Sequence, residues 1–248
     1  MKRNITLIFA GFLLLAQPAH ATSNDDAGGA LTFTFIGNEA FAITDGEATL
    51  VSDFPYQSGY SIYMEYDPAA LEIAGEVVAL ITHRHGDHFD ANLFAERDWK
   101  IIGPREVTDG IAPERVVPLA IPPLSNPKTY FYSPFKYENI FVVGDMLVYA
   151  FPTPHSGTGH YSYAVDWRGQ SLYFFGDTET PKMFLDIATG LGDFDVVFMT
   201  PWVLRPLLAD GTDIPAKLIV IYHQQVGEAL PQCGKCRALV QGESFTLD

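Results

Sequence analysis

The chain has 248 residues, of which 48% are hydrophobic, and a formal net charge of −15. This length suits one large domain with a substantial core. So acidic a surface repels a phosphate backbone, which argues against a nuclease and against any nucleic-acid partner.

The N-terminus has the pattern of a secretory signal peptide. Lys2 and Arg3 precede an apolar stretch at 5–16, and a small-x-small cleavage site ends at Ala21. The apolar stretch is too short to span a membrane comfortably, and no cysteine near the cleavage site offers a lipid anchor. We therefore expect an exported protein, periplasmic or secreted, without a membrane anchor. The expected organisation is a signal peptide over 1–21, a flexible N-terminus over 22–30 and a single domain over 31–248.

Short apolar segments separated by turn signals follow from residue 31. This pattern predicts an antiparallel meander that precedes any long helix. The predicted strands are 31–36, 40–43, 48–51 and 60–64. A continuous apolar run at 77–81 has the composition of a buried strand.

That buried strand leads directly into three histidines and an aspartate, in the run Thr-His-Arg-His-Gly-Asp-His at 82–88. His83 and His85 are two residues apart, so in an extended chain they project the same way and can bind one metal ion. If the chain turns after the glycine, Asp87 and His88 point elsewhere, toward a second metal position. Zinc accepts this mixture of nitrogen and carboxylate ligands, whereas calcium prefers oxygen alone. The alternative is a histidine-rich surface turn, which we would expect for a single histidine.

Beyond this cluster, the pattern predicts a helix over 89–97 and a strand over 99–102. Residues 113–137 are rich in proline and then in aromatic side chains, which predicts a long loop. This loop either packs on the core or covers a substrate as a lid. The remaining predicted elements are two hairpins (140–143 with 146–151, and 161–167 with 171–175), a helix over 181–188 that begins with proline, and strands over 196–199 and 218–222.

Further ligand-type residues follow three of these strands. His155, Asp177 and His223 each come at or just after a strand end, which is where open-sheet α/β proteins place their chemistry. His160 can bond a substrate or support a ligand, or simply satisfy local hydrogen bonds. Trp202 can line a substrate pocket or be a core or rim aromatic.

These motifs resemble those of the metallo-β-lactamase superfamily. The matching runs are Thr-His-Arg-His-Gly-Asp-His at 82–88, Pro-His at 154–155, Phe-Gly-Asp-Thr at 175–178 and Tyr-His at 222–223, in the family's order. The resemblance covers about residue 31 to the C-terminus. It implies an α/β fold, a four-layer αββα sandwich with a two-metal site at one edge. The opening and closing runs of the domain look like those of the lactonase and phosphodiesterase-like branch.

The resemblance also implies a cofactor of two divalent ions, zinc by preference, and a division of their ligands. The first ion would take His83, His85 and His155, the second Asp87, His88 and His223, and Asp177 would bridge them. Two such ions about 3.5–4 Å apart lower the pKa of a shared water toward neutrality, and the resulting hydroxide is the nucleophile. Asp87 would act as the catalytic carboxylate that orients this water or accepts its proton. The expected activity is hydrolysis of an ester, lactone, amide or phosphodiester bond in a small-molecule substrate.

Three alternatives stay open. A periplasmic β-lactamase would suit export, although the turn at 156–159 only partly resembles the turn found in those enzymes. Oxygen- or nitric-oxide-reducing relatives that bind two irons typically carry glutamate where this chain has His85. A non-catalytic metal-binding protein is the third alternative, but degenerate relatives tend to lose ligands, and all seven positions are filled here.

Cys233 and Cys236 are the two cysteines of the chain. In an exported protein, the run Cys-Gly-Lys-Cys predicts a local disulfide or two free thiols. A redox-active pair is the alternative, although such pairs normally open a helix after a strand, and Pro231 with Gly234 favours a turn.

Overall fold

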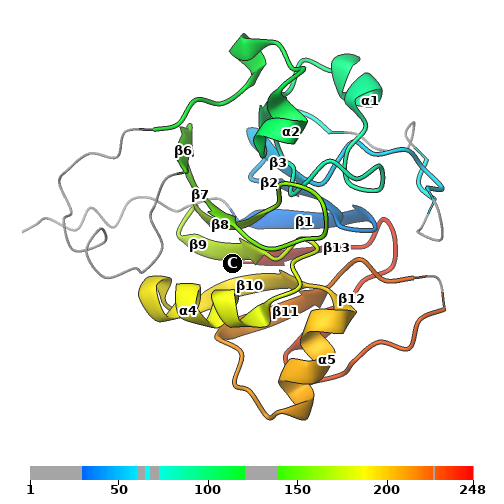
Figure 1. Cartoon of the computed structure of the whole chain (residues 1–248), viewed down its shortest axis with the longest axis vertical. Helices are drawn as coiled ribbons and strands as arrows, with labels where there is room; N and C mark the ends of the chain where they lie inside the picture. Colours follow the sequence, from blue (N-terminus) through cyan, green and yellow to red (C-terminus); the bar gives the residue numbers. More distant parts are fainter. Residues whose placement is uncertain (1–29, 61–64, 68–72, 121–138, 226, 248) are drawn as a thin grey trace, which may run out of the picture.

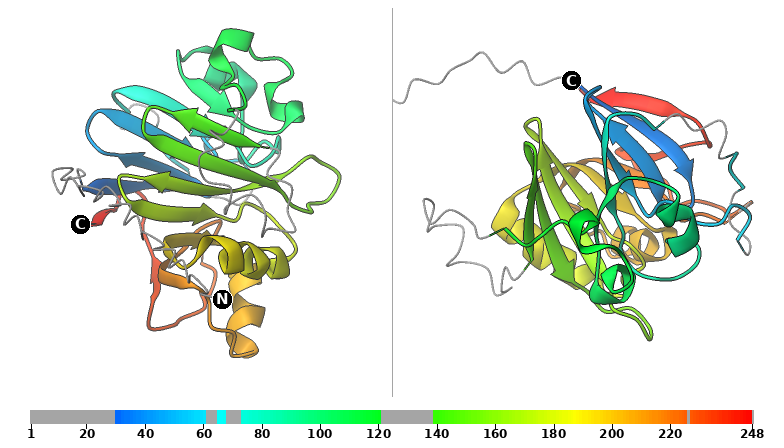
Figure 2. Two further views of the ribbon diagram at one scale, coloured as in Figure 1. Left: turned by 90° about the vertical axis from the view of Figure 1, so that its left-hand side faces the viewer. Right: turned by 90° about the horizontal axis from the view of Figure 1, so that it is seen from above.

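Two stacked sheets are built from the apolar strands of the chain (Figures 1 and 2). The computed structural model describes residues 30–60, 65–67, 73–120, 139–225 and 227–247. The predicted signal peptide, nearly all of the strand predicted at 60–64 and most of the predicted loop at 113–137 lie outside these residues. No helix among the described residues is long and apolar enough to cross a membrane.

The first sheet contains the predicted meander. Its strand order is β13-β1-β2-β3-β4-β5. Strands β1 to β3 pair antiparallel, whereas β3, β4 and β5 run parallel. The bounds are Leu31–Gly37 (β1), Ala40–Thr44 (β2), Ala48–Ser52 (β3), Glu76–Leu80 (β4), Lys100–Ile102 (β5) and Ser244–Leu247 (β13).

The second sheet contains the two predicted hairpins, with the strand order β12-β11-β10-β9-β8-β7-β6. Strands β6 to β9 pair antiparallel, and β9 to β12 run parallel. The bounds are Ile140–Val143 (β6), Met146–Pro152 (β7), Tyr161–Trp167 (β8), Gln170–Phe174 (β9), Phe194–Met199 (β10), Ala216–Ile221 (β11) and Cys236–Ala238 (β12).

Helices cover the outer face of each sheet, which makes four layers (Figure 1). Between the sheets, the ring of Phe198 stacks on Phe174 at 4.5 Å and meets Phe41 of the opposite sheet at 4.8 Å. Phe184 belongs to the apolar layer under the second sheet, and Phe94 to the layer under the first. The helices are α1 (Ala91–Ala95), α2 (Arg105–Thr108), the short 3₁₀ helix η2 (Pro113–Arg115), α4 (Pro181–Leu191) and α5 (Pro201–Ala209). The predicted αββα sandwich is confirmed.

The helices differ most from the sequence predictions. The helix predicted at 89–97 begins at Ala91 because the Asp90 carboxylate caps it, accepting hydrogen bonds from the backbone N–H groups of Asn92 and Leu93. Helix α5 is absent from the sequence predictions; it contains Pro206, which removes one backbone donor from its interior. The short elements α2, β12 and β13 were also not predicted.

The strand directions explain where the chemistry gathers. Because β8 is antiparallel to both β7 and β9, strands β7, β9, β10 and β11 all end at the same edge of the second sheet. In the first sheet, β1, β3 and β4 likewise share a direction. Every predicted ligand follows one of these strands.

Candidate metal centre

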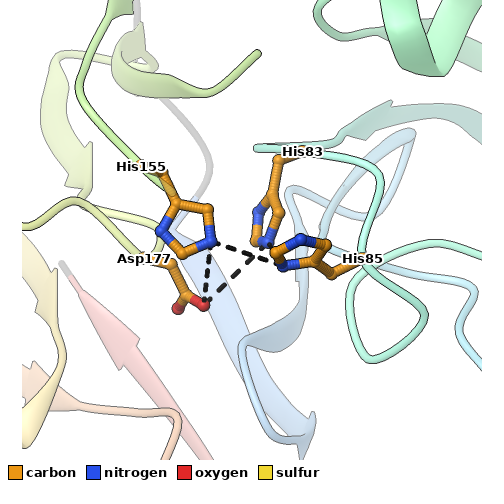
Figure 3. A group of neighbouring side chains, drawn as sticks. All are labelled: His83, His85, His155 and Asp177. Carbon is orange, nitrogen blue, oxygen red and sulfur yellow. Dashed lines mark hydrogen bonds and ion pairs between the residues drawn. The ribbon is translucent and has the colours of Figure 1, made fainter. Parts of the chain in front are cut away.

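Four side chains converge at this edge from three separate strand ends (Figure 3). His83 Nε2 lies 2.8 Å from His85 Nδ1, and His155 Nε2 lies 3.3 Å from the same atom. The Asp177 Oδ2 atom is 3.9 Å from both His83 Nε2 and His155 Nε2. Three ring nitrogens and one carboxylate oxygen therefore surround a single point. His85 is exposed, so this group opens to solvent.

Asp87, His88 and His223 form a second group, which is buried. The Asp87 Oδ2 atom is 3.5 Å from both His88 Nε2 and His223 Nε2. Asp177 lies between the two groups: its Oδ2 atom is 3.5 Å from His88 Nε2, and its Oδ1 atom is 3.2 Å from His223 Nε2. The structure thus brings all seven predicted ligands together, with Asp177 in the position expected of a bridge.

Asp53 contacts His88 of the second group, and the sequence analysis missed this role. Its carboxylate accepts hydrogen bonds from the backbone N–H of Thr82 at 2.7 Å and from the Thr82 hydroxyl at 2.9 Å. It also lies 3.2 Å from His88 Nδ1. A proton held on Nδ1 leaves Nε2 facing the other carboxylates, which is how a metal-binding imidazole is usually oriented. The signal was available, because Asp53 lies two residues after the strand predicted at 48–51.

The turn between β1 and β2 closes the second group and was also missed. The Asn38 side-chain amide donates to the Asp87 carbonyl oxygen, and the His223 backbone N–H donates to the Asn38 carbonyl oxygen, both at 2.8 Å. Glu39 is fully buried, with its Oε2 atom 3.4 Å from His88 Nδ1. A turn that the sequence marks as ordinary therefore places a carboxylate beside the site.

His160 is buried, with 3% of its surface exposed. Its Nε2 atom accepts a hydrogen bond from the Asp177 backbone N–H at 2.9 Å, and its Nδ1 atom lies 2.6 Å from the Thr153 hydroxyl oxygen. The N–H of the preceding Gly176 donates to the Tyr222 hydroxyl at 2.6 Å. These bonds favour a supporting role for His160, in which it fixes the backbone that carries Asp177. Contact with a substrate remains a prediction.

Trp202 lies in the first turn of α5 and is 41% exposed. Its ring meets the His223 imidazole edge-on, with centroids 4.9 Å apart. An exposed aromatic side chain therefore flanks the second group. The position fits the predicted pocket lining, which stays a prediction.

Charge within the site suits a bound cation. Burial and the neighbouring His88 hold the pKa of His83 far below its usual range. Burial also lowers the pKa of His88, but the carboxylates of Asp177 and Asp53 outweigh it and hold that pKa well above its usual value. For His223, burial is likewise outweighed by Asp177, so its pKa rises to about 9. Protons on His88 and His223 thus offset the negative charge of the carboxylates, a role that a bound divalent ion would take over.

The donor set fits two divalent ions. The buried His88 Nε2 atom makes no hydrogen bond to any described residue, so a metal would satisfy it. Imidazole nitrogens and carboxylate oxygens are ligands of catalytic zinc and related ions. A disulfide joins Cys233 to Cys236, the first residue of β12, so the predicted local disulfide is formed.

Comparisons with known proteins place the fold. Three similar solved structures are Igni18, a metallo hydrolase from Ignicoccus hospitalis, YhfI, a metallo-beta-lactamase fold protein from Bacillus subtilis, and a possible metal-dependent hydrolase from Veillonella parvula. Their TM-scores are 0.62, 0.57 and 0.58, at 14%, 13% and 12% identity. The matches cover 88%, 87% and 88% of this chain and 99%, 99% and 100% of theirs. At these identities the likeness concerns the fold.

No curated protein matches the sequence. The family model described as a beta-lactamase superfamily domain matches residues 66–239. Because this match covers more than half of the chain, and because the described fold agrees with it, the protein belongs to the metallo-β-lactamase superfamily.

Proposed function

We propose that the protein is a metal-dependent hydrolase whose centre holds two divalent ions. The observation that carries the proposal is the position of Asp177, whose two oxygen atoms face His88 and His223 of the second group while Oδ2 also faces the first. One carboxylate between two sets of ligands is the arrangement that a shared pair of ions requires. Among divalent ions, zinc fits the histidine-rich first position best.

Bound ions would supply an activated water as the nucleophile and would polarise the bond to be cleaved. The protein's own residues set the geometry. Asp53 orients His88, and His160 holds the backbone N–H of Asp177. Asp87 is buried, with 7% of its surface exposed, and its carboxylate lies 3.5 Å from both His88 Nε2 and His223 Nε2, where it can orient the water or accept its proton. No serine or cysteine nucleophile is needed.

The substrate would be a small molecule with an ester, lactone, amide or phosphodiester bond. Solvent reaches the site on the side of His85, and Trp202 offers an apolar contact beside His223. Export to the periplasm or the medium is part of the proposal, and it rests on the signal-peptide pattern of residues 1–21. Cell fractionation followed by N-terminal sequencing tests it: the protein should be found outside the cytoplasm and should begin after Ala21, and a protein confined to the cytoplasm with an intact Met1 would contradict it.

Metal content tests the centre itself. Elemental analysis of the mature protein should give about two divalent ions per chain. In Asp177→Ala the affinity for both ions should fall, because each ion loses an anionic ligand and the repulsion between the two ions is less compensated. In His223→Ala the first ion should stay bound. Asp186→Ala, on the exposed face of α4, is the matched control and should keep both ions.

Two results would contradict this division of ligands, provided that circular dichroism shows folded protein. Equal retention of both ions in the Asp177 variant would refute the bridge. Loss of both ions from the His223 variant would refute the separate groups.

A periplasmic β-lactamase is the second candidate function. The observation that favours it is the shared superfamily together with the signal-peptide pattern. Nitrocefin turnover, compared with turnover of ester, lactone and phosphodiester substrates, separates the two candidates. Absence of any metal from the purified protein would instead favour a non-catalytic scaffold.

A further inference from the structure

Glu39 is a fully buried carboxylate that the sequence motifs do not explain. Neither of its carboxylate oxygens makes a hydrogen bond to a described residue. Burying such a group without a partner costs several kcal/mol in general, so a buried carboxylate is normally paired or bound to a metal. This position therefore calls for a positive charge.

The cationic neighbours of Glu39 are His88 and His223, and both are shared with other carboxylates. The nearest cationic group is His88, whose Nδ1 atom is 3.4 Å from Glu39 Oε2 but closer, at 3.2 Å, to Asp53 Oδ2. One N–H cannot fully satisfy two carboxylates. The nearby Asp177 adds a further negative charge. Glu39, Asp177 and His223 each place one ligand atom within 4.8 Å of the others, which is close enough for a single ion.

The backbone holds Glu39 in this place. The Ser52 hydroxyl donates to the Glu39 carbonyl oxygen at 2.8 Å. The adjacent Asn38 is tied at 2.8 Å to the carbonyl oxygen of Asp87 and to the backbone N–H of His223. The turn is thus fastened to two loops that carry ligands, which fixes the backbone position from which the buried Glu39 side chain projects.

We infer that Glu39 is an additional ligand of the metal centre, binding the second ion together with Asp177 and His223. This inference rests on the metal centre proposed above. A third carboxylate, besides Asp87 and Asp177, makes the second position richer in oxygen. Because carboxylate ligands suit Mn²⁺ better than they suit softer ions, the second position should tolerate Mn²⁺ more readily than the first.

Titration of the metal-free protein with Mn²⁺ and with Zn²⁺, followed by calorimetry, tests the inference. In Glu39→Gln, which keeps the shape and removes the charge, the affinity of the second position for Mn²⁺ should fall about 10- to 100-fold. Binding at the first position should not change. The control is Glu47→Gln, in the exposed turn between β2 and β3, where the side chain is 88% exposed; it should bind as the wild type does.

Different failures have different meanings. Wild-type protein that binds no ion would contradict the proposed metal centre itself. Two ions bound with unchanged affinity in folded Glu39→Gln would contradict only the role of Glu39. A crystal structure of the metal-loaded wild type decides the matter even if the variant does not fold: a Glu39 oxygen about 2.0–2.2 Å from an ion is expected, and ions that lack a bond to Glu39 would overturn the inference.

Discussion

Gly176 is a position where the addition of one methyl group should disturb the metal centre. Its φ is +61°, and a Cβ atom there would lie 2.4 Å from His160 Nε2 and 2.8 Å from Thr82 Cγ2. Both neighbours are buried, with His160 bonded to the Asp177 backbone and Thr82 to Asp53. Gly176→Ala must therefore displace groups that position the metal ligands.

The expected cost has two parts. A left-handed backbone conformation destabilises the folded state by about 1–2 kcal/mol when the residue has a side chain. Forcing a methyl group into a filled space costs about 1–3 kcal/mol more. Gly169→Ala isolates the first part, because Gly169 has φ +76° and no atom within 4 Å of its added Cβ. The difference between the variants should be about 1–3 kcal/mol.

Denaturant unfolding of both metal-free variants measures this difference, and elemental analysis measures the effect on the site. Gly176→Ala should lose metal affinity, since displacement of His160 removes the hydrogen bond that fixes Asp177. Gly169→Ala should keep its ions. If Gly176→Ala were no less stable than Gly169→Ala and bound both ions normally, the idea that His160 positions Asp177 by close packing would be wrong.

Four further predictions concern the support of the metal ligands, the disulfide, the substrate pocket and the effect of bound metal on stability. Asp53→Ala should lower the affinity for the second ion about 10- to 100-fold, because the Thr82 backbone N–H, the Thr82 hydroxyl and His88 Nδ1 lose their acceptor; an unchanged metal titration would contradict this. Replacement of both Cys233 and Cys236 by serine should lower the free energy of unfolding by about 2 kcal/mol, from the loop-closure entropy of a four-residue loop, with hydrolysis near wild type. Lost activity at full metal content would reveal a coupling to the disulfide. Trp202→Ala should raise KM several-fold without changing metal content; an unchanged KM would remove Trp202 from the pocket. Chelation should lower Tm, and returning an ion at a hundred times its Kd should restore about 2.7 kcal/mol per position; a Tm insensitive to chelation would argue against a metal that binds the folded state.

Much of the site could be predicted because its residues follow strands with a strong local signal. The apolar run before His83 has the composition of a buried strand, and the hairpins before His155 and Asp177 have turn residues between alternating segments. Local periodicity fixes where such strands end. Residues at those ends then meet at one edge because their strands run in the same direction.

Helix α5 shows where local signals mislead. Pro201 at its first position favours a helix start, but Pro206 in its interior disfavours continuation. The helix nevertheless persists because Val203, Leu204 and Leu207 pack into the core under the second sheet. Burial of apolar side chains outweighs the lost backbone hydrogen bond, and that burial depends on a sheet formed by distant parts of the chain.

Glu39 could not be placed from the sequence for the opposite reason. Its local signal is that of a two-residue turn between strands, where polar side chains normally face water. Here Glu39 is fully buried because the turn at the end of β1 lies against loops that follow β4 and β11, about 50 and 180 residues away in sequence. Only the stacking of two sheets creates that contact. A carboxylate in such a turn costs stability unless a cation compensates it; its presence in this sequence is therefore best explained by a function at the centre beside it.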